Sequence, residues 1–348
     1  MAAPSSDQPR VSRKHRLPGR VFIANATDFQ PGIRSDVRTP KKSRQISYDI
    51  MNELTQKDLW KNIDFEFGLN MEVTRLNIRS DIIFRSCFCN FTTLTSLTVS
   101  NTNMTMLPDG IGKLTQLKTL HITRTQITTV PVTIGQLTQL TSCQFDQNRL
   151  TTLPDTIGHL TQLVYLNLSF NQLTSVPDTI GNLRQLENLY LNNNHLTHLP
   201  NTLFDLTALT LLLCNYNRLT MLQNGIGNLT KLTWLTLCNN QFTTIPDSIG
   251  NLQSLTHLFI SNNQLKALPA TVSLLIQLRV INISYNRITD IPDIHNLTKL
   301  DAFIANDNYQ LRLPPPLPCM IQRNSSMYRR SIPVEEGEVV EEVYDTIY

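Results

Sequence analysis

Apolar residues return every 23 positions through the middle of the chain. Within one unit, Leu186, Leu189 and Leu191 show the spacing L-x-x-L-x-L, and Tyr190 stands between the last two leucines. This alternation places Leu189 and Leu191 on one face and Tyr190 on the other, which predicts a short strand. All units run in the same direction, so we expect the strands to pair in parallel. The first leucine of the spacing recurs as Leu94, Leu117, Leu140, Leu163, Leu186, Leu209, Leu232, Leu255 and Leu278.

An asparagine follows the predicted strand at the same interval in seven successive units. The chain must turn there, and a turn leaves backbone groups unpaired. We expect each asparagine amide to bond such groups in its own unit and in the next unit, so that the column forms a ladder along the stack. The members are Asn148, Asn171, Asn194, Asn217, Asn240, Asn263 and Asn286.

A second turn is predicted after the proline of each unit, for example Pro177. Proline has no N–H and ends strand pairing. The residue that follows it, Asp178, is expected to cap a short helical or 3-10 turn. Ile180 and Leu183 lie three residues apart in this turn, so both are expected to point inward.

The combined pattern L-x-x-L-x-L-x-x-N-x-L, with a period in the twenties, is the leucine-rich repeat signature. It predicts an α/β repeat solenoid, a horseshoe with a concave parallel sheet and short helical or 3-10 turns on its convex side. The stretches Leu153-Pro-Asp-Thr-Ile-Gly-His-Leu160 and Ile245-Pro-Asp-Ser-Ile-Gly-Asn-Leu252 make the chain resemble the intracellular 23-residue class. That class is the Ras group, with the Shoc-2/Sur-8 scaffold and the plant Ras-group repeat proteins, and the Scribble-type polarity proteins use a similar unit. The resemblance implies a non-catalytic scaffold or adaptor of intracellular signalling, with a small GTPase or a phosphatase as partner.

One short motif adds to this resemblance. Lys61-Asn-Ile63-Asp-Phe65 fits a loose basic-x-aliphatic-x-aromatic pattern, and a related motif ahead of the repeats helps the Ras–Raf scaffold to bind protein phosphatase 1. Lys61, Ile63 and Phe65 are therefore candidate phosphatase-docking residues. The alternative is that Ile63 and Phe65 pack into an N-terminal cap.

The composition divides the chain into four segments. Residues 1–45 hold ten Lys and Arg against three acids and few aliphatic residues, which predicts a disordered basic tail. Residues 46–93 are expected to form an N-terminal cap with a degenerate repeat, because a solenoid needs a cover over its first exposed core. About ten repeats occupy residues 94–312, the last of them one residue short. Residues 313–348 hold a proline-rich stop and an acidic tail, predicted to be disordered.

Charge and cysteine content narrow the function class. The net charge is only +3, and 16% of the residues are charged, so we expect no nucleic-acid partner. The first residues have no apolar signal-peptide core, and no stretch is long and apolar enough to span a bilayer. The six cysteines follow no disulfide framework, and Cys143 and Cys214 occupy leucine positions. We therefore expect a cytoplasmic protein, with nuclear entry through the basic tail as an alternative.

Catalytic chemistry has no support in the sequence. The seven histidines are scattered, and no glycine-rich phosphate loop, nucleophile elbow or metal-ligand spacing is present. We predict no enzyme activity, no metal and no cofactor.

The residues between the leucines define the candidate binding surface. In the early units they are small and polar, whereas later units carry large apolar and aromatic side chains, which are typical of binding hot spots. We call the following residues the aromatic face: Tyr165, Phe170, Tyr190, Leu211, Leu213, Tyr216, Trp234 and Phe259. The alternative is that these side chains only pack on one another across neighbouring strands.

The sequence leaves three functional hypotheses. The first is an intracellular scaffold that binds a signalling protein through the aromatic face. The second is a targeting or substrate-recognition adaptor, of pathogen or viral origin, that uses its charged tails. The third is an extracellular adhesin or receptor fragment, which glycosylation at Asn167 would favour. None of them fixes the oligomeric state.

Overall fold

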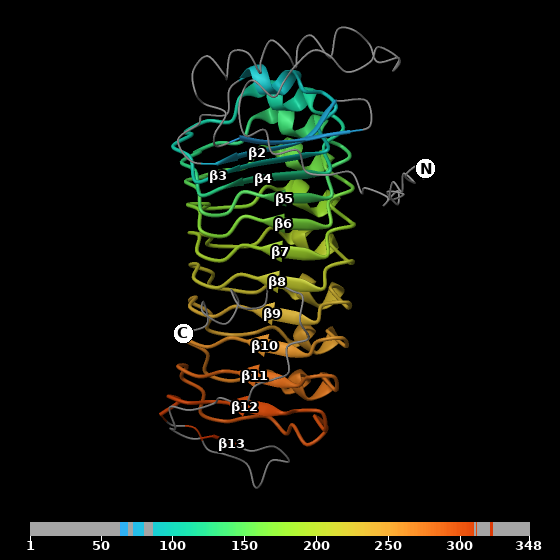
Figure 1. Ribbon diagram of the computed structural model, residues 1–348. Helices are drawn as coiled ribbons and strands as arrows, with labels where there is room; N and C mark the ends of the chain where they lie inside the picture. The colour runs from blue at the N-terminus through green and yellow to red at the C-terminus, as the bar shows by residue number, and fades with distance from the viewer. Residues whose placement is uncertain (1–62, 69–71, 80–85, 310, 312–320, 323–348) are drawn as a thin grey trace, which may run out of the picture.

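The computed structural model describes residues 63–68, 72–79, 86–309, 311 and 321–322. The repeats stack into an elongated solenoid (Figure 1). The predictions for the tail 1–45, for Lys61, for the proline-rich stop and for the acidic tail lie outside the described residues.

One open sheet runs along the solenoid, with its strands in chain order from β1 to β13. β1 is antiparallel to β2, and every later neighbour pairs in parallel. The prediction of parallel stacking is therefore confirmed for the repeats. The strands are β1 (Ile63–Phe67), β2 (Val73–Arg79), β3 (Ser96–Ser100), β4 (Thr119–Thr123), β5 (Ser142–Gln144), β6 (Tyr165–Asn167), β7 (Asn188–Tyr190), β8 (Leu211–Leu213), β9 (Trp234–Thr236), β10 (His257–Phe259), β11 (Val280–Asn282), β12 (Ala302–Ile304) and β13 (Ile321–Gln322).

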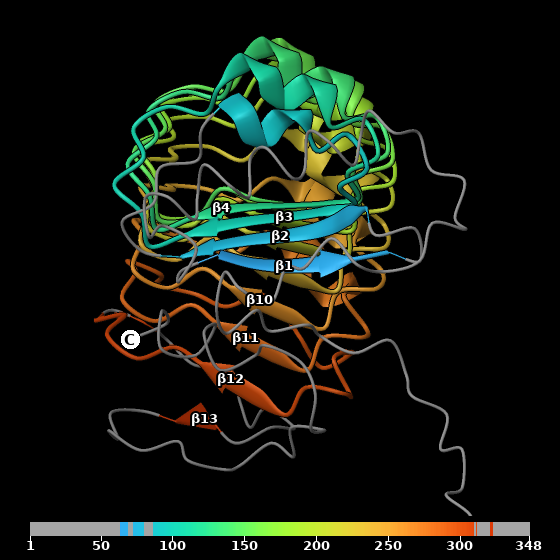
Figure 2. The ribbon, with the colours of Figure 1, turned by 45° about the horizontal axis from the view of Figure 1, so that its top comes forward.

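Short 3-10 helices line the side opposite the sheet (Figure 2). From η4 onward, each helix begins directly after the position that proline holds in most units. The backbone N–H of the residue after the helix donates to the carbonyl of the isoleucine position, as Leu183 does to Ile180 in η7 (Asp178–Asn182). The 3-10 helices are η3 (Ser86–Asn90), η4 (Asp109–Lys113), η5 (Val132–Gln136), η6 (Asp155–His159), η7 (Asp178–Asn182), η8 (Asn201–Asp205), η9 (Asn224–Asn228), η10 (Asp247–Asn251) and η11 (Ala270–Leu274). The predicted leucine-rich repeat horseshoe is confirmed.

The core lies between the sheet and the 3-10 helices. In the unit around β7, Leu186, Leu189 and Leu191 are each 0% exposed, while Tyr190 is partly exposed on the other side of the strand. Cys143 and Cys214 fill leucine positions and are equally buried. Each unit covers its neighbours' apolar side chains, so the core is continuous along the stack.

The asparagine ladder joins each unit to the one before it. The Asn194 amide Nδ2 donates to the carbonyls of Leu191 (3.1 Å) and Asn192 (3.2 Å) in its own unit and of Leu168 (3.0 Å) in the preceding unit. Its Oδ1 accepts the Leu173 N–H at 3.0 Å, also from the preceding unit. The prediction that the asparagine amide bonds the next unit was therefore wrong, because it bonds the preceding unit instead.

The ladder extends beyond the predicted members at both ends. Asn308 repeats the pattern, with Nδ2 bonded to the carbonyls of Ile283 and Ala305. Toward the N-terminus, threonine takes the column position. Thr125 is buried and donates its backbone N–H to Asn148 Oδ1 at 3.1 Å.

The expected aspartate caps are not formed. The cap residue of η7 is Pro177, and Asp178 makes no side-chain cap bond because it is already the first residue of the turn. The Asp178 carbonyl is bonded instead by the hydroxyl of Thr202 in the next unit, at 2.6 Å. Thr179 bonds Asp155 in the same way at 2.7 Å, so hydroxyls tie the 3-10 helices together along the convex side.

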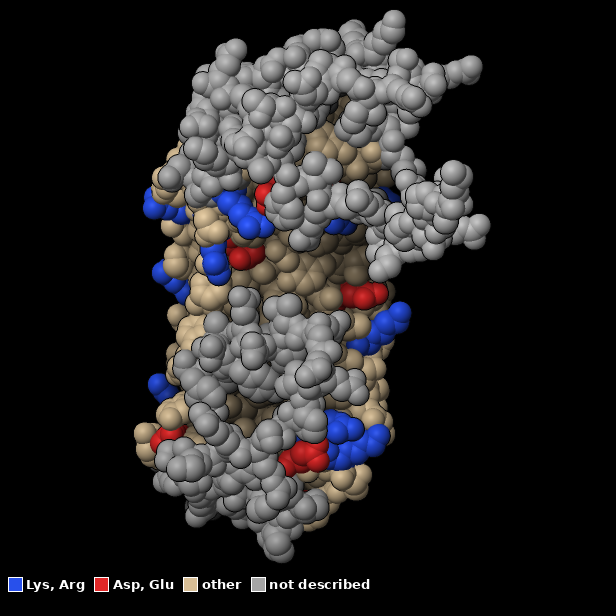
Figure 3. Space-filling model, viewed as in Figure 1, with Lys and Arg blue, Asp and Glu red and all other residues tan. Residues whose placement is uncertain are grey.

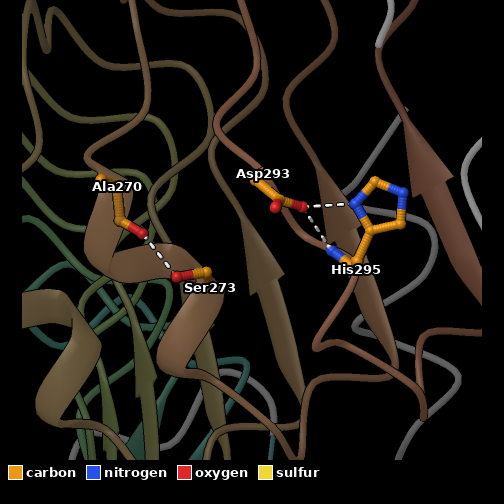
Figure 4. Close-up of polar contacts among 4 residues, drawn as sticks. All are labelled: Ala270, Ser273, Asp293 and His295. Carbon is orange, nitrogen blue, oxygen red and sulfur yellow. Dashed lines mark hydrogen bonds and ion pairs between the residues drawn. The ribbon is translucent and has the colours of Figure 1, made fainter. Parts of the chain in front are cut away.

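The unit that is one residue short turns differently from the other units. Within residues 291–297 the structure has no 3-10 helix, and the turn is formed by Asp293, whose Oδ1 accepts the His295 N–H at 3.0 Å and contacts the His295 ring (Figure 4). In η11 of the preceding unit, Ser273 donates its hydroxyl to the Ala270 carbonyl at 2.8 Å. The aspartate contacts replace the missing residue, and Ile294 and Leu297 still reach the core.

Candidate functional site

The outer side of the sheet presents side chains in two columns set by strand register. Leu211, Trp234 and His257 occupy one column on β8, β9 and β10. Leu213, Thr236 and Phe259 occupy the second column on the same strands. Parallel pairing places members of one column within contact distance of their neighbours. The structure thus brings the strand members of the aromatic face together along one surface.

Two tyrosines form the N-terminal part of this surface. Tyr165 on β6 and Tyr190 on β7 have ring centroids 5.1 Å apart, tilted by 41°. Burial, followed by the neighbouring Tyr190 ring, raises the pKa of the Tyr165 phenol well above its usual range. The Tyr165 hydroxyl therefore stays protonated at neutral pH.

Phe170 and Tyr216 lie just past the strands rather than on them. Both have left-handed backbone conformations, with φ of 56° and 54°. The same holds for the residue before the asparagine position in every described repeat, a regularity that the sequence analysis did not predict. Phe170 is 41% exposed.

Trp234 and His257 form the tightest ring contact of the surface. Their ring centroids are 3.9 Å apart with an interplanar angle of 16°, and Phe259 lies 5.7 Å from the Trp234 ring. His257 was not among the predicted site residues, although its place in the strand column, directly beside Trp234, was visible in the sequence. The stacked rings support the alternative interpretation, in which these side chains pack on one another across neighbouring strands.

Two members of the aromatic face differ from the expectation of exposure. Leu213 is 1% exposed and Phe259 is 6% exposed, although both lie on the outer side of the sheet. Thr236, between them in register, is 0% exposed. The accessible members of the aromatic face are consequently Tyr165, Phe170, Tyr190, Leu211, Tyr216 and Trp234.

Few charges face this surface. In Figure 3 the part of the described surface that is visible over the sheet is mostly uncharged, and the charged residues lie mainly along its margins. Near His257, Arg279 and Asp301 pair with each other at 3.7 Å. Burial and then Arg279 lower the pKa of His257 to about 4, so its imidazole is neutral at physiological pH. The arrangement suits contact with an uncharged partner surface.

The His257 environment predicts a pH dependence of stability. Its pKa is about 4 in the folded chain and 6.5 for an unperturbed histidine, so between these values the unfolded chain binds more protons. Stability from this residue is complete above pH 6.5 and decreases as the pH falls toward 4. We expect the wild type to lose more stability than His257→Phe over that interval, as measured by urea midpoints from pH 8 to 4. His195→Gln, which removes an exposed histidine, is the control. Parallel wild-type and His257→Phe curves would contradict the assignment.

Two of the candidate phosphatase-docking residues, Ile63 and Phe65, lie at the N-terminal end of the sheet. Ile63 and Phe65 are 7% and 8% exposed on β1, and the Phe65 ring makes an edge contact with Phe91 at 6.2 Å. This matches the alternative in which both side chains pack into the cap. Docking on a phosphatase stays a prediction, and it requires β1 to leave the sheet.

Cysteines and metal ligands offer no reactive centre among the described residues. Burial raises the pKa of Cys89 to about 11 and raises those of Cys143, Cys214 and Cys238. Those four form no disulfide, and neither does Cys87. In the described part of the chain, no group of three or more His, Cys, Asp or Glu residues is placed to hold a metal ion. No helix found there is long and apolar enough to cross a membrane.

Solved structures with related folds include two receptors and an internalin. The plant peptide hormone receptor RGFR1 in complex with RGF2 shares 29% identity and a TM-score of 0.62, over 68% of this chain and 40% of that chain. A TDR receptor shares 27% identity and a TM-score of 0.60, over 68% and 43%. The Listeria monocytogenes internalin InlF, at 22% identity and a TM-score of 0.54 over 73% and 79%, shows the fold alone.

The chain spans less than half the length of those two receptor chains. No curated protein sequence matches it. The family model described as a leucine-rich repeat region matches residues 76–164, 155–239 and 223–309, which together cover more than half of the chain. With the repeat signature, the asparagine ladder and the open parallel sheet, this match shows that the chain belongs to the leucine-rich repeat family.

Proposed function

We propose that the chain is a non-catalytic scaffold or adaptor whose protein partner docks on the aromatic face. Leucine-rich repeats are typical of protein–protein interaction domains, so the family supports protein binding as the broad class of function. The observation that carries the proposal is the row of accessible aromatic side chains on β6, β7 and β9, in a surface with little charge. Such side chains are enriched among the residues that dominate binding energy.

The proposal includes intracellular signalling as its setting. The free, buried cysteines of the described chain support a reducing compartment, because none of them contributes a stabilising disulfide there. The Ras-group consensus supports partners such as a small GTPase or a phosphatase. The uncharged face favours a partner with an apolar contact surface.

Peptide recognition is a second candidate, favoured by one observation. The receptor RGFR1, similar at 29% identity, is described in complex with RGF2. A peptide ligand would occupy the same face, so the two candidates differ in partner size and compartment rather than in the site.

The double variant Tyr190→Ala/Trp234→Ala tests the shared site. Both side chains are partly exposed, so folding should survive, which circular dichroism checks. We expect a partner recovered by affinity purification with the wild type to bind the variant at least tenfold more weakly, since each truncated hot-spot side chain typically costs more than about 1 kcal/mol. Val132→Ala/Leu274→Ala removes exposed apolar side chains from the convex side and is the matched control. An identical set of partners for wild type and both variants would sink the proposal.

A further inference from the structure

One helix on the convex side begins without the usual proline. Among η4 to η11, only η9 (Asn224–Asn228) follows another residue, Gln223. Gln223 has a φ of −75°, near the −65° of Pro177, but no ring locks it there. Its Nε2 donates to the Leu199 carbonyl at 2.8 Å, whereas its Oε1 is buried without a hydrogen-bond partner among the described residues. Because such an acceptor is unfavourable, η9 starts from a less restrained position than its neighbours.

Asn224 and Gly225 begin this helix and form the only Asn–Gly pair of the 348-residue sequence. Asn224 is exposed and Gly225 is partly exposed. The Ile226 N–H closes the 3-10 turn by donating to the Gln223 carbonyl at 3.1 Å, so the Gly225 N–H precedes the first bond of the turn. Gly225 has no side chain to shield its nitrogen, and a Cβ there would lie 2.6 Å from Phe204 Cδ2. The groups of a reactive pair therefore lie at an exposed helix start.

An Asn–Gly pair reacts without an enzyme. The glycine nitrogen attacks the asparagine Cγ and closes a succinimide ring, while the Cγ–Nδ2 bond breaks and the amide group leaves as ammonia with the proton of the glycine N–H. Water then breaks one of the two ring C–N bonds and gives aspartate or isoaspartate. Ring closure needs a rotation about the Asn224 Cα–C bond that a 3-10 turn does not allow, so η9 has to open locally first.

We propose that Asn224 is a site of spontaneous deamidation, at which local opening of η9 brings the Gly225 nitrogen to the Asn224 side chain. The aspartate product fits the fold and adds a negative charge to the convex side, because aspartate already holds this position in η4, η6, η7 and η10, as Asp109, Asp155, Asp178 and Asp247. The isoaspartate product lengthens the backbone beside Phe204, which is 1% exposed, and should destabilise the unit.

The test incubates the full chain in mildly alkaline buffer and maps its tryptic peptides by mass spectrometry with fragmentation. The peptide 219–231 contains both Asn224 and Asn228, and leucine follows Asn228, so the peptide carries an internal control. Asn201 holds the same helix position in η8 and precedes Thr202, so it is the control from the neighbouring unit. We expect Asn224 to deamidate about tenfold faster than either control, because glycine leaves the attacking nitrogen unshielded and the backbone free to rotate.

Gln223→Pro tests the opening step. Proline suits the φ of Gln223 and restricts the opened chain, so this variant should deamidate at Asn224 about twofold more slowly than the wild type, or slower still. Gln223→Ala is the matched control. It also loses the bond to the Leu199 carbonyl but gains no restriction of φ, so it should react at least as fast as the wild type. The inference would be overturned if Asn224 reacted no faster than Asn201 and Asn228, or if the two Gln223 variants reacted at equal rates.

Discussion

Replacing Asn194 with alanine is expected to lower the free energy of unfolding by about 4 kcal/mol. The Leu173 N–H donates to Asn194 Oδ1 and becomes a buried, unpaired donor in the variant. Its loss alone costs about 1–3 kcal/mol. The carbonyls of Leu168 and Leu191 lose one donor each but keep the amides of Asn171 and Asn217, so each of these losses is smaller.

Urea unfolding followed by circular dichroism measures the effect. The matched control is Asn182→Ala, which removes an exposed asparagine from η7 in the same unit and should change stability by no more than about 0.5 kcal/mol. Asn194→Asp keeps an acceptor but loses the donor and buries a charge, so it should be no more stable than the alanine variant. A loss below about 1 kcal/mol for Asn194→Ala would mean that the ladder contributes little to holding the units together.

The sequence determined the fold to the level of individual repeats because each unit carries the same constraints. Alternation placed Leu189 inside and Tyr190 outside, and the fixed interval required parallel strands. The asparagine ladder followed from the need to pair turn backbone groups. Its direction did not follow, because amide bonds to the preceding or to the next unit are compatible with the same sequence. Only the handedness and offset of the stack decide between them.

The candidate site was less predictable from the sequence. Column positions placed Tyr165, Tyr190 and Trp234 on one surface, but exposure depends on how neighbouring side chains fill the space. Leu213 and Phe259 share the outer column with Thr236 and are buried, which no periodicity reports. The left-handed φ at Phe170 was hidden as well, since bulky residues rarely adopt this conformation and nothing local predicts it.

One regularity on the convex side, a glycine in one unit paired with a larger residue in the next, was present in the sequence but could be explained only with the structure. The position after the isoleucine of each 3-10 helix is glycine in most units, and a Cβ there would meet the threonine or, at Gly227, the serine of the next unit. At Gly135 it would lie 2.7 Å from the Thr156 carbonyl oxygen and 2.8 Å from its Cβ. Where this position carries a side chain instead, as at Cys89 and Phe204, the next unit has Gly110 or Gly225 in place of threonine.

The unit that is one residue short follows the same rule. Ser273 occupies the glycine position in η11, and the next unit passes from Asp293 directly to Ile294, so that the threonine position is absent. Neighbouring units thus share a fixed volume on the convex side, which one side chain can fill from either unit. The close packing of protein interiors explains why both cannot do so at once.

Restoring the usual residue at only one of these paired positions should therefore damage the fold, and restoring both should repair much of the damage. In Gly225→Thr, the new Cβ would lie 2.6 Å from Phe204 Cδ2 and 2.9 Å from Cγ. Phe204 is 1% exposed and has no room to move, so we expect a loss of about 3 kcal/mol. Phe204→Gly leaves a cavity and should cost about 4 kcal/mol.

The double variant Phe204→Gly/Gly225→Thr recreates the pair seen at Gly135 and Thr156, and it should be about 3 kcal/mol more stable than the sum of the two single losses predicts. Urea unfolding of the four proteins in this cycle gives the interaction free energy directly. Asn224→Ala, at the exposed first residue of η9, is the control and should be close to neutral. Additive losses would show that the two positions contribute to stability independently of each other. A large favourable coupling would instead show that packing on the convex side depends on the pair of residues that two neighbouring repeats contribute. The effect of a substitution in one repeat then depends on the sequence of the next repeat.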